Sequence, residues 1–239
     1  MEMKDFRKWN EEMVKRYNPE NYIFHSNFFI RKIEQLRFQK IVRLLGHLNE
    51  SFFLDIGCGS GYLLSRVDTA FGIGLDISEL MVKTAKERCG KDKIVIQGDA
   101  EALPFRGNTF HAICLTEVIE HVPHPRRVLE EVRRVARDDA IIVVTVPNEP
   151  FINFLKKIIF TLRLHRILFK ERYLPARKMQ DEWHLHVFSL KKLKEVSQGI
   201  FEFKKTEAVP MRFVPLRYIV KVQKVKKNQK IRGVSCRVK

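Results

Sequence analysis

Short apolar runs alternate with amphipathic stretches through the middle of the chain, between residues 51 and 146. The apolar runs predict β-strands at residues 52–56, 71–75, 93–97, 112–115 and 140–146. The amphipathic stretches predict helices at residues 62–67, 79–88 and 125–136. Because strands that alternate with helices usually run parallel, this pattern predicts an α/β sheet covered by helices.

The two ends of the chain follow other patterns. Over residues 1–48, apolar positions recur every three or four residues among charged ones, which predicts helices that pack on the core and end near Gly46. After Val146 we expect an insertion, a helix at 190–197 and two strands near 201–207 and 213–222. The expected units are a helical segment over 1–48, one domain over 49–224 with a basic lid insertion at about 147–186, and a basic tail over 225–239.

Composition narrows the class of protein. Forty-five Lys and Arg against 28 Asp and Glu give a net charge of +17, which favours contact with an anionic surface, either nucleic acid or lipid headgroups. The alternative is that the charge only aids solubility. The four cysteines are scattered without a CxxC pair, so they indicate neither a disulfide framework nor a thiolate metal site. The start is charged throughout and no segment has the roughly 18 apolar residues that span a bilayer. We expect a cytoplasmic protein, peripheral at the membrane at most.

A glycine-rich loop follows the first predicted strand. Residues 55–61 have the sequence DIGCGSG, in which Gly57 and Gly59 remove the side chains that would keep a ligand from the backbone. The spacing differs from the dinucleotide motif GxGxxG, since the sixth position counted from Gly57 is Tyr62. No Gly-Lys-Ser/Thr follows, which excludes a Walker loop. The loop therefore predicts a nucleoside site.

Acidic residues follow the next two predicted strands. Asp76 closes the second strand about 20 residues after Asp55, where a carboxylate can accept hydrogen bonds from both ribose hydroxyls. The alternative is that Asp76 or Ser78 caps the helix that begins near Glu79. Asp99 follows the third strand, at the carboxyl edge of the sheet, where open α/β sheets bind ligands.

In this order, these three motifs resemble those of class I S-adenosylmethionine-dependent methyltransferases, in the branch that includes ubiquinone and menaquinone biosynthesis enzymes. The resemblance is close over residues 50–146. It implies a Rossmann-like three-layer α/β sandwich with a mostly parallel seven-stranded sheet, an antiparallel last strand and a helical insertion after strand five. One departure is the sequence ARDD at 136–139, where the family has a Lys-Pro-Gly-Gly turn; we expect a turn there, remote from the cofactor.

The resemblance also implies S-adenosylmethionine as the cofactor and assigns its contacts. The methionine end would be held by Asp55, Gly57, Cys58 and Gly59, and flanked by Thr116 and Glu117. The ribose would be bound by Asp76, and the adenine by Ile77, Gly98, Asp99 and Ala100.

Methyl transfer from a sulfonium requires positioning of the acceptor and, for an oxygen or carbon acceptor, removal of a proton. Glu117, Glu120 and His121 share one face if their segment forms a helical turn, and His121 is then a candidate general base with Glu117 beside it. Two alternatives stay open. The three residues shape the loop, or they bind a divalent metal together with His184 or His186, as similar segments do in ubiquinone O-methyltransferases and in enzymes that methylate the terminal 2′-hydroxyl of small RNAs.

The insertion carries information about the acceptor. Its residues 151–170 contain no acid. One helical face would present the apolar side chains Phe151, Leu155, Ile158 and Leu162. The cations are Lys156, Lys157, Arg163, Arg166 and Lys170. This pattern is expected of a helix on an anionic membrane, although packing on the core and contact with RNA are alternatives.

The expected function is transfer of a methyl group to an oxygen or carbon of a small, lipophilic acceptor. A 2′-hydroxyl RNA methyltransferase and a non-catalytic S-adenosylmethionine-binding protein are the alternatives. Methylation of exocyclic base nitrogens is disfavoured, because no Asn/Asp-Pro-Pro-Tyr segment follows the fourth strand.

Overall fold

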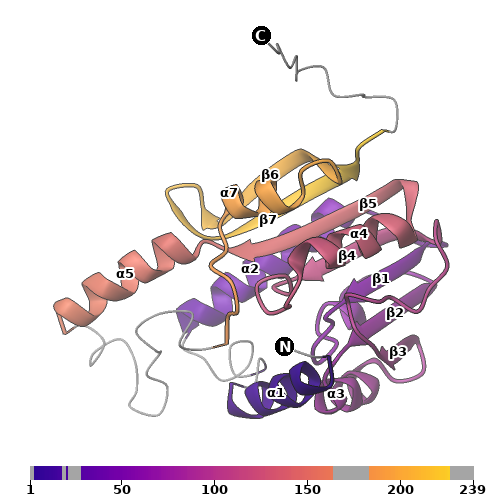
Figure 1. Ribbon diagram of the computed structural model, residues 1–239, viewed down its shortest axis with the longest axis horizontal. Coiled ribbons are helices and arrows are strands. Elements are labelled where there is room, and N and C mark those ends of the chain that lie inside the picture. Colours follow the sequence, from indigo (N-terminus) through magenta and orange to yellow (C-terminus); the bar gives the residue numbers. More distant parts are fainter. Residues whose placement is uncertain (1–2, 18–19, 21–27, 164–182, 227–239) are drawn as a thin grey trace, which may run out of the picture.

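The computed structural model describes residues 3–17, 20, 28–163 and 183–226. Within them, seven strands form one sheet in the order β3-β2-β1-β4-β5-β7-β6 (Figure 1). The strands are β1 (Phe52–Ile56), β2 (Phe71–Asp76), β3 (Lys93–Gln97), β4 (Phe110–Thr116), β5 (Ala136–Pro147), β6 (Phe201–Met211) and β7 (Val214–Lys224). Strands β1 to β5 pair in parallel, whereas β7 runs antiparallel to both β5 and β6. The predicted α/β fold with an antiparallel last strand is confirmed.

Helices cover both faces of the sheet. They are α1 (Met3–Arg16), α2 (Phe28–Leu45), the 3₁₀ turn η2 (Leu64–Arg66), α3 (Glu79–Cys89), α4 (Pro125–Val135), α5 (Glu149–Thr161) and α7 (Leu190–Val196). Leu54 and Ile56 of β1 pack into the core that α4 and α7 cover, whereas Phe53 packs into the core that α2 and α3 cover. Successive strand residues point to opposite faces, so one strand serves two cores.

Helix ends follow local signals in the sequence. Ser78 caps α3, because its hydroxyl accepts a hydrogen bond from the Met81 amide at 3.2 Å. Gly46, with a φ of +70°, follows the last residue of α2, as predicted, and its amide donates to the Val42 carbonyl. The proposed division of the chain at residues 48 and 224 stays a prediction. Arg166, Lys170 and the tail beyond residue 226 lie outside the described residues.

Two predicted elements are wrong. Of residues 62–67, only Leu64–Arg66 are helical, and they form the 3₁₀ turn η2 in place of the predicted α-helix. Residues 136–139 are not a turn but the first part of β5, which begins where α4 ends. The segment lacks Gly and Pro, so nothing forces a turn, and a register shift between Phe110 and Ala112 accommodates the longer strand.

The parallel strands β1 to β4 end at one edge of the sheet, and their following loops gather there. Helix α1 lies beside α3, and α5 extends from the end of β5 (Figure 1). Among the described helices, none has the length and apolar character required to cross a bilayer.

Candidate active site

A cavity of about 450 Å³ lies at this carboxyl edge. Its wall includes all ten residues that were expected to contact the cofactor, together with Glu117 and His121. The expected cofactor residues are Asp55, Gly57, Cys58, Gly59, Asp76, Ile77, Gly98, Asp99, Ala100 and Thr116. The wall is completed by side chains of α1, α2, α5 and β7, which lie far from these motifs in the sequence. The structure thus brings the predicted residues together, while their roles stay predictions.

The glycine loop has the conformation that its sequence predicts. Gly57 has a φ of +64°, and a Cβ atom added there would lie 2.4 Å from Cγ2 of Val118. Gly59 has a φ of +50° and no atom within 4 Å of its Cβ position. Gly57 is therefore required by both conformation and space, whereas Gly59 leaves open space beside the loop.

Asp76 ties the loop to the second strand. Its Oδ2 accepts a hydrogen bond from the Gly59 amide at 2.8 Å, and its Oδ1 accepts one from the Ser78 amide at 2.9 Å. Burial raises the pKa of Asp76 to about 6, against the effect of these two hydrogen bonds. Of the two capping alternatives, the one in which Ser78 caps α3 is confirmed and the one in which Asp76 is the cap is wrong, while the ribose contact of Asp76 stays a prediction. A carboxylate has further lone pairs, so Asp76 can still accept from a ligand.

Asp55 is a buried acid with an unsatisfied oxygen. Its side chain is 1% exposed, and its Oδ1 has no hydrogen-bond partner among the described residues. Burial, followed by the charge of Asp76, raises the pKa of Asp55 to about 8. The hydroxyl of Thr116 also lacks a partner in this part of the chain. Buried polar atoms without partners in a cavity wall indicate a ligand that supplies donors and acceptors.

Glu117 lies at the end of β4 with a φ of +55°, a conformation that few residues other than glycine adopt. Its Oε1 accepts from the Thr145 hydroxyl at 3.0 Å, and its Oε2 accepts from Nε of Arg217 at 3.0 Å. Burial acts to raise the pKa of Glu117, but the charges of Arg217 and Arg37 outweigh it and lower the pKa. Glu117 is therefore an anion that protein groups already hold.

This carboxylate belongs to a network of four charges. Glu34 of α2 pairs with Arg37 at 2.6 Å and with Arg217 of β7 at 3.2 Å, and Nη1 of Arg37 lies 3.7 Å from Glu117. We call Glu34, Arg37, Glu117 and Arg217 the charge quartet. Of the charge quartet, the sequence pattern predicted only Glu117 as a site residue. Glu34 and Arg37 could have been recognised, because they lie three residues apart and interrupt the apolar stripe of α2 that includes Phe38 and Ile41.

The expected common face of Glu117, Glu120 and His121 is wrong. The segment forms a tight turn, in which the His121 amide donates to the Val118 carbonyl, and the positive φ of Glu117 turns its side chain another way. Glu120 is fully buried and does not border the cavity. Neither of its carboxylate oxygens has a hydrogen-bond partner among the described residues. Burial and the neighbouring Glu117 raise the pKa of Glu120 well above its usual range, so the group is a neutral acid.

His121 borders the cavity as a neutral imidazole. Its Nδ1 lies 3.3 Å from the Trp183 carbonyl oxygen, which leaves Nε2 as the acceptor if Nδ1 carries the proton. Burial, then the nearby His184, lowers the pKa of His121 to about 3. The charge of Glu117 opposes this shift.

The two later histidines contact other partners. Nδ1 of His184 lies 3.0 Å from Oε1 of the buried Glu149, and Nε2 of His186 lies 3.0 Å from the Val122 carbonyl oxygen. Within residues 3–17, 28–163 and 183–226, no three His, Cys, Asp or Glu side chains are placed to hold a metal ion. The alternative of a metal site therefore gains no support from this part of the chain.

Helix α5 borders the cavity with one of its two apolar sides. The cavity side consists of Ile152, Leu155, Lys156, Ile159 and Phe160. Of the expected apolar face, Ile158 is 37% exposed and Leu162 is 62% exposed. Since α5 carries apolar residues on both sides, the sequence pattern alone does not select the face that packs inward.

A family model spans the residues that were expected to contact the cofactor, and several relatives match about half of the chain. The family model "Methyltransferase domain" matches residues 54–144. Together with the fold and the motif residues around the cavity, this match shows that the chain carries a class I S-adenosylmethionine-dependent methyltransferase domain.

Individual relatives extend the comparison. Uncharacterized protein MJ1252 of Methanocaldococcus jannaschii is 34% identical over 143 residues, which cover 59% of this chain and 51% of that protein. The demethylmenaquinone methyltransferase of Shouchella clausii is 33% identical over 45% of this chain and 49% of the enzyme. The chain thus spans about half the length of the curated relatives it matches. Magnesium protoporphyrin IX methyltransferase from Synechocystis PCC 6803, solved with bound SAH, superposes with a TM-score of 0.66 at 18% identity, covering 94% of this chain and all of that one; it shows the shared fold.

Proposed function

We propose that this protein transfers a methyl group from S-adenosylmethionine to an oxygen or carbon of a small, lipophilic acceptor. The observation that carries the proposal is one cavity that joins the expected cofactor residues to apolar side chains of α2 and α5. The bound cofactor supplies a methyl group already activated for displacement. The chain itself then has to hold two molecules in line and manage one proton.

The residues around the glycine loop fit this cofactor. The unpaired Oδ1 of Asp55 would accept from the ammonium group of the methionine end, whose positive charge would also lower the raised pKa of this acid and so favour its carboxylate form. Asp76 would accept from the ribose hydroxyls with the lone pairs that Gly59 and Ser78 leave free. The positive φ values at the loop glycines give a ligand close access to the backbone.

The rest of the cavity fits a lipophilic acceptor. Its apolar wall consists of Ile30 and Ile33 from α2, Ile152, Leu155 and Ile159 from α5, and Leu216 from β7. Such a wall favours apolar molecules over nucleotides. The relative from Shouchella clausii bears the name of an enzyme that acts on a lipophilic molecule, demethylmenaquinone, which supports this choice of acceptor class.

His121 would accept a hydrogen bond from the acceptor and then its proton. Because the pKa of His121 is lowered to about 3, the imidazole is neutral and ready at physiological pH, but it is a weak base. Such a base suits an acceptor with an acidic O–H or C–H, such as a phenol or enol. Glu117, held by Arg217 and Thr145, would stabilise the imidazolium as it forms.

Calorimetry tests the cofactor assignment. We expect S-adenosylhomocysteine to bind the wild-type chain and to bind Asp76→Ala at least about tenfold more weakly, since a hydrogen bond from a hydroxyl to a charged acceptor contributes about 1.5–3 kcal/mol. Asp68→Ala, an exposed acid outside the cavity, is the matched control. Absence of binding, or equal affinity for all three proteins, would refute the proposal.

Labelled cofactor tests the acceptor class. After incubation of the protein with cell extract and methyl-labelled S-adenosylmethionine, we expect label in the organic-solvent fraction and not in RNA. Label in RNA would instead establish the 2′-hydroxyl alternative, and absence of transfer to any fraction would favour a non-catalytic binding protein. His121→Ala is expected to abolish transfer while S-adenosylhomocysteine still binds.

A further inference from the structure

Three segments far apart in the sequence present large apolar side chains to solvent. They are the start of α2, the turn between β6 and β7, and the outer side of α5. The exposed fractions are 66% for Phe28, 75% for Phe29, 56% for Met211, 87% for Phe213, 59% for Phe154 and 62% for Leu162. Single exposed apolar side chains are common, but a group of this size marks an interaction surface.

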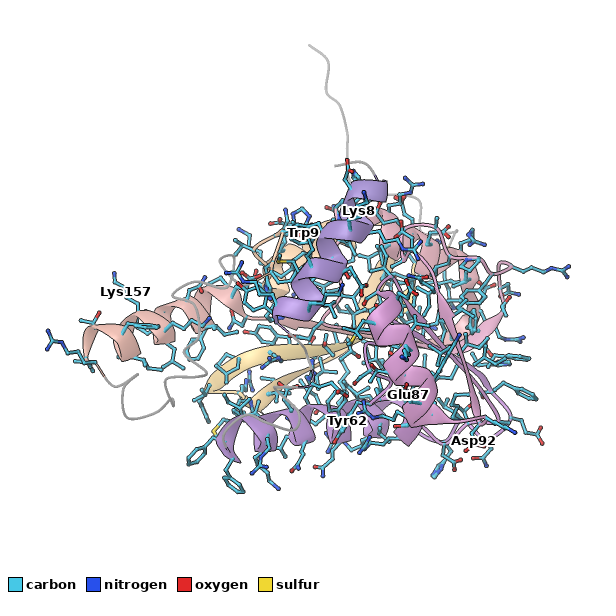
Figure 2. All side chains as sticks on the ribbon, turned by 90° about the horizontal axis from the view of Figure 1, so that it is seen from below. Lys8, Trp9, Tyr62, Glu87, Asp92 and Lys157 are labelled. Atoms are coloured by element: carbon cyan, nitrogen blue, oxygen red, sulfur yellow. The ribbon has the colours of Figure 1, made fainter. Side chains whose placement is uncertain are left out.

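The three segments lie at one end of the molecule. Nζ of Lys40 donates to the Ala208 carbonyl, which holds α2 along β6, and the Asn148 amide donates to the Leu216 carbonyl, which holds the start of α5 beside β7. Both views show α5, the first turn of α2 and the β6–β7 turn at the same end (Figures 1 and 2). We call residues 28–33, 154–163 and 211–214 the apolar tip.

The charges of the apolar tip have one sign. None of its three segments contains Asp or Glu. Its exposed cations are Arg31, Lys32, Lys157, Arg163 and Arg212. Lys157 extends from α5 away from the body of the protein (Figure 2). A nucleic acid duplex would engage the cations but leave the phenylalanines in water, and an apolar protein surface would leave the cations without counter-charges. Aromatic side chains surrounded by Lys and Arg match the interface of an anionic lipid bilayer, where rings insert and cations contact headgroups.

The segments of the apolar tip also form the wall of the cavity. Ile30 and Ile33 lie in the same turns of α2 as the exposed Phe28 and Phe29, and the inner side of α5 borders the cavity opposite Phe154. If the apolar tip rests on a bilayer, the apolar half of the cavity lies next to the lipid. We propose that the apolar tip docks the protein on an anionic membrane, from which the acceptor enters the cavity. Entry of the acceptor from the membrane rests on the proposed function, whereas docking itself does not.

Vesicle sedimentation of the full chain tests the docking. We expect binding to vesicles of phosphatidylcholine with phosphatidylglycerol, and at least about tenfold weaker binding to phosphatidylcholine alone, because several cations lose their partners. The double variant Phe29→Asp/Phe213→Asp is expected to lose at least about tenfold in affinity for the anionic vesicles, since each substitution removes one inserted ring. Ile94→Asp is the matched control, because Ile94 is 60% exposed on β3, outside the apolar tip.

Each outcome of this experiment decides something. Absence of vesicle binding by the wild-type chain, or an equal loss in Ile94→Asp, overturns the proposal. Unchanged binding by the double variant also overturns it, because the attraction would then be electrostatic only. Calorimetry with S-adenosylhomocysteine provides the second readout. A double variant that binds this ligand like wild type but fails to bind vesicles supports docking, and docking would stand even if no methyl transfer were found.

Discussion

Asp55 is a buried acid whose ionisation affects the stability of the fold. Its folded-state pKa of about 8 lies above the ordinary value of 3.8, so the folded protein retains a proton that the unfolded chain releases. The associated stability is fully present below pH 3.8 and is lost as the pH rises toward 8. In thermal melts without ligand, we expect Asp55→Asn to be more stable than wild type at pH 9 and the difference to shrink at pH 4. Asp68→Asn, an exposed control, should melt like wild type at both values; a difference independent of pH would contradict the argument.

Gly57 is the residue with the strictest packing requirement in the loop. A Cβ atom at this position would lie 2.4 Å from Val118, and the φ of +64° adds backbone strain. We expect Gly57→Ala to lower the free energy of unfolding by about 1–3 kcal/mol, and Val118→Ala to restore part of it in the double variant. Gly46→Ala isolates the strain, since Gly46 has a φ of +70° and no atom within 4 Å. Chemical denaturation measures all four variants; a loss in Gly57→Ala no larger than in Gly46→Ala would disprove the clash.

At the scale of elements, Glu11 of α1 accepts hydrogen bonds from the first turn of α3, and these bonds hold α1 over the cavity. The Glu11 carboxylate accepts hydrogen bonds from the Glu79 and Leu80 amides, at 3.0 and 3.3 Å, and so satisfies the first turn of α3. The same helix lines the cavity with Phe6 and Asn10. Helix α1 therefore depends on α3 for its position.

We expect Glu11→Ala to cost about 1 kcal/mol of stability, the usual effect of removing a capping side chain. It should also speed the dissociation of S-adenosylhomocysteine, because α1 forms part of the cavity wall. Glu12→Ala is the matched control, since Glu12 is the exposed neighbour on the same helix. Stopped-flow dissociation and chemical denaturation give the two readouts. Equal rates for both variants would contradict the role of Glu11.

The elements of the core were predictable because each follows from local patterns. Strands β1 to β3 show apolar runs bounded by glycines and acids, and Ser78 marks the start of α3. Two features that the sequence pattern did not predict depend on tertiary contacts. The start of β5 is set by pairing with Phe110, and the inward face of α5 by the cavity it borders. The motif residues of the site were predicted, whereas Arg37 and Arg217 were not, because only the fold brings α2, β4 and β7 together.

At the scale of the whole molecule, the charge quartet joins α2 to β7 and to the loop after β4. We expect Glu34→Gln to destabilise the protein by about 3 kcal/mol, since the buried Arg37 would lose its 2.6 Å partner and keep only Glu117 at 3.7 Å. The double variant Glu34→Gln/Arg37→Met should lose less, because it removes both charges. Glu130→Gln is the control; its pair with Arg126 is about half exposed and should contribute a few tenths of a kcal/mol at most. Chemical denaturation tests this, and equal losses in the single and double variants would contradict it.

The position of the quartet along the chain bears on how the protein is made. Residue 34 leaves the ribosome long before residue 217, so the segment that forms α2 is present for much of synthesis without its partner on β7. Glu34 and Arg37 are one helical turn apart, and in the folded protein Nη2 of Arg37 lies 2.6 Å from Oε2 of Glu34. Before β7 is made, these two side chains can neutralise each other. The nascent helix thus brings no unbalanced charge to the face that it will later bury. Only the arrival of the last strand turns that local pair into one wall of the cavity.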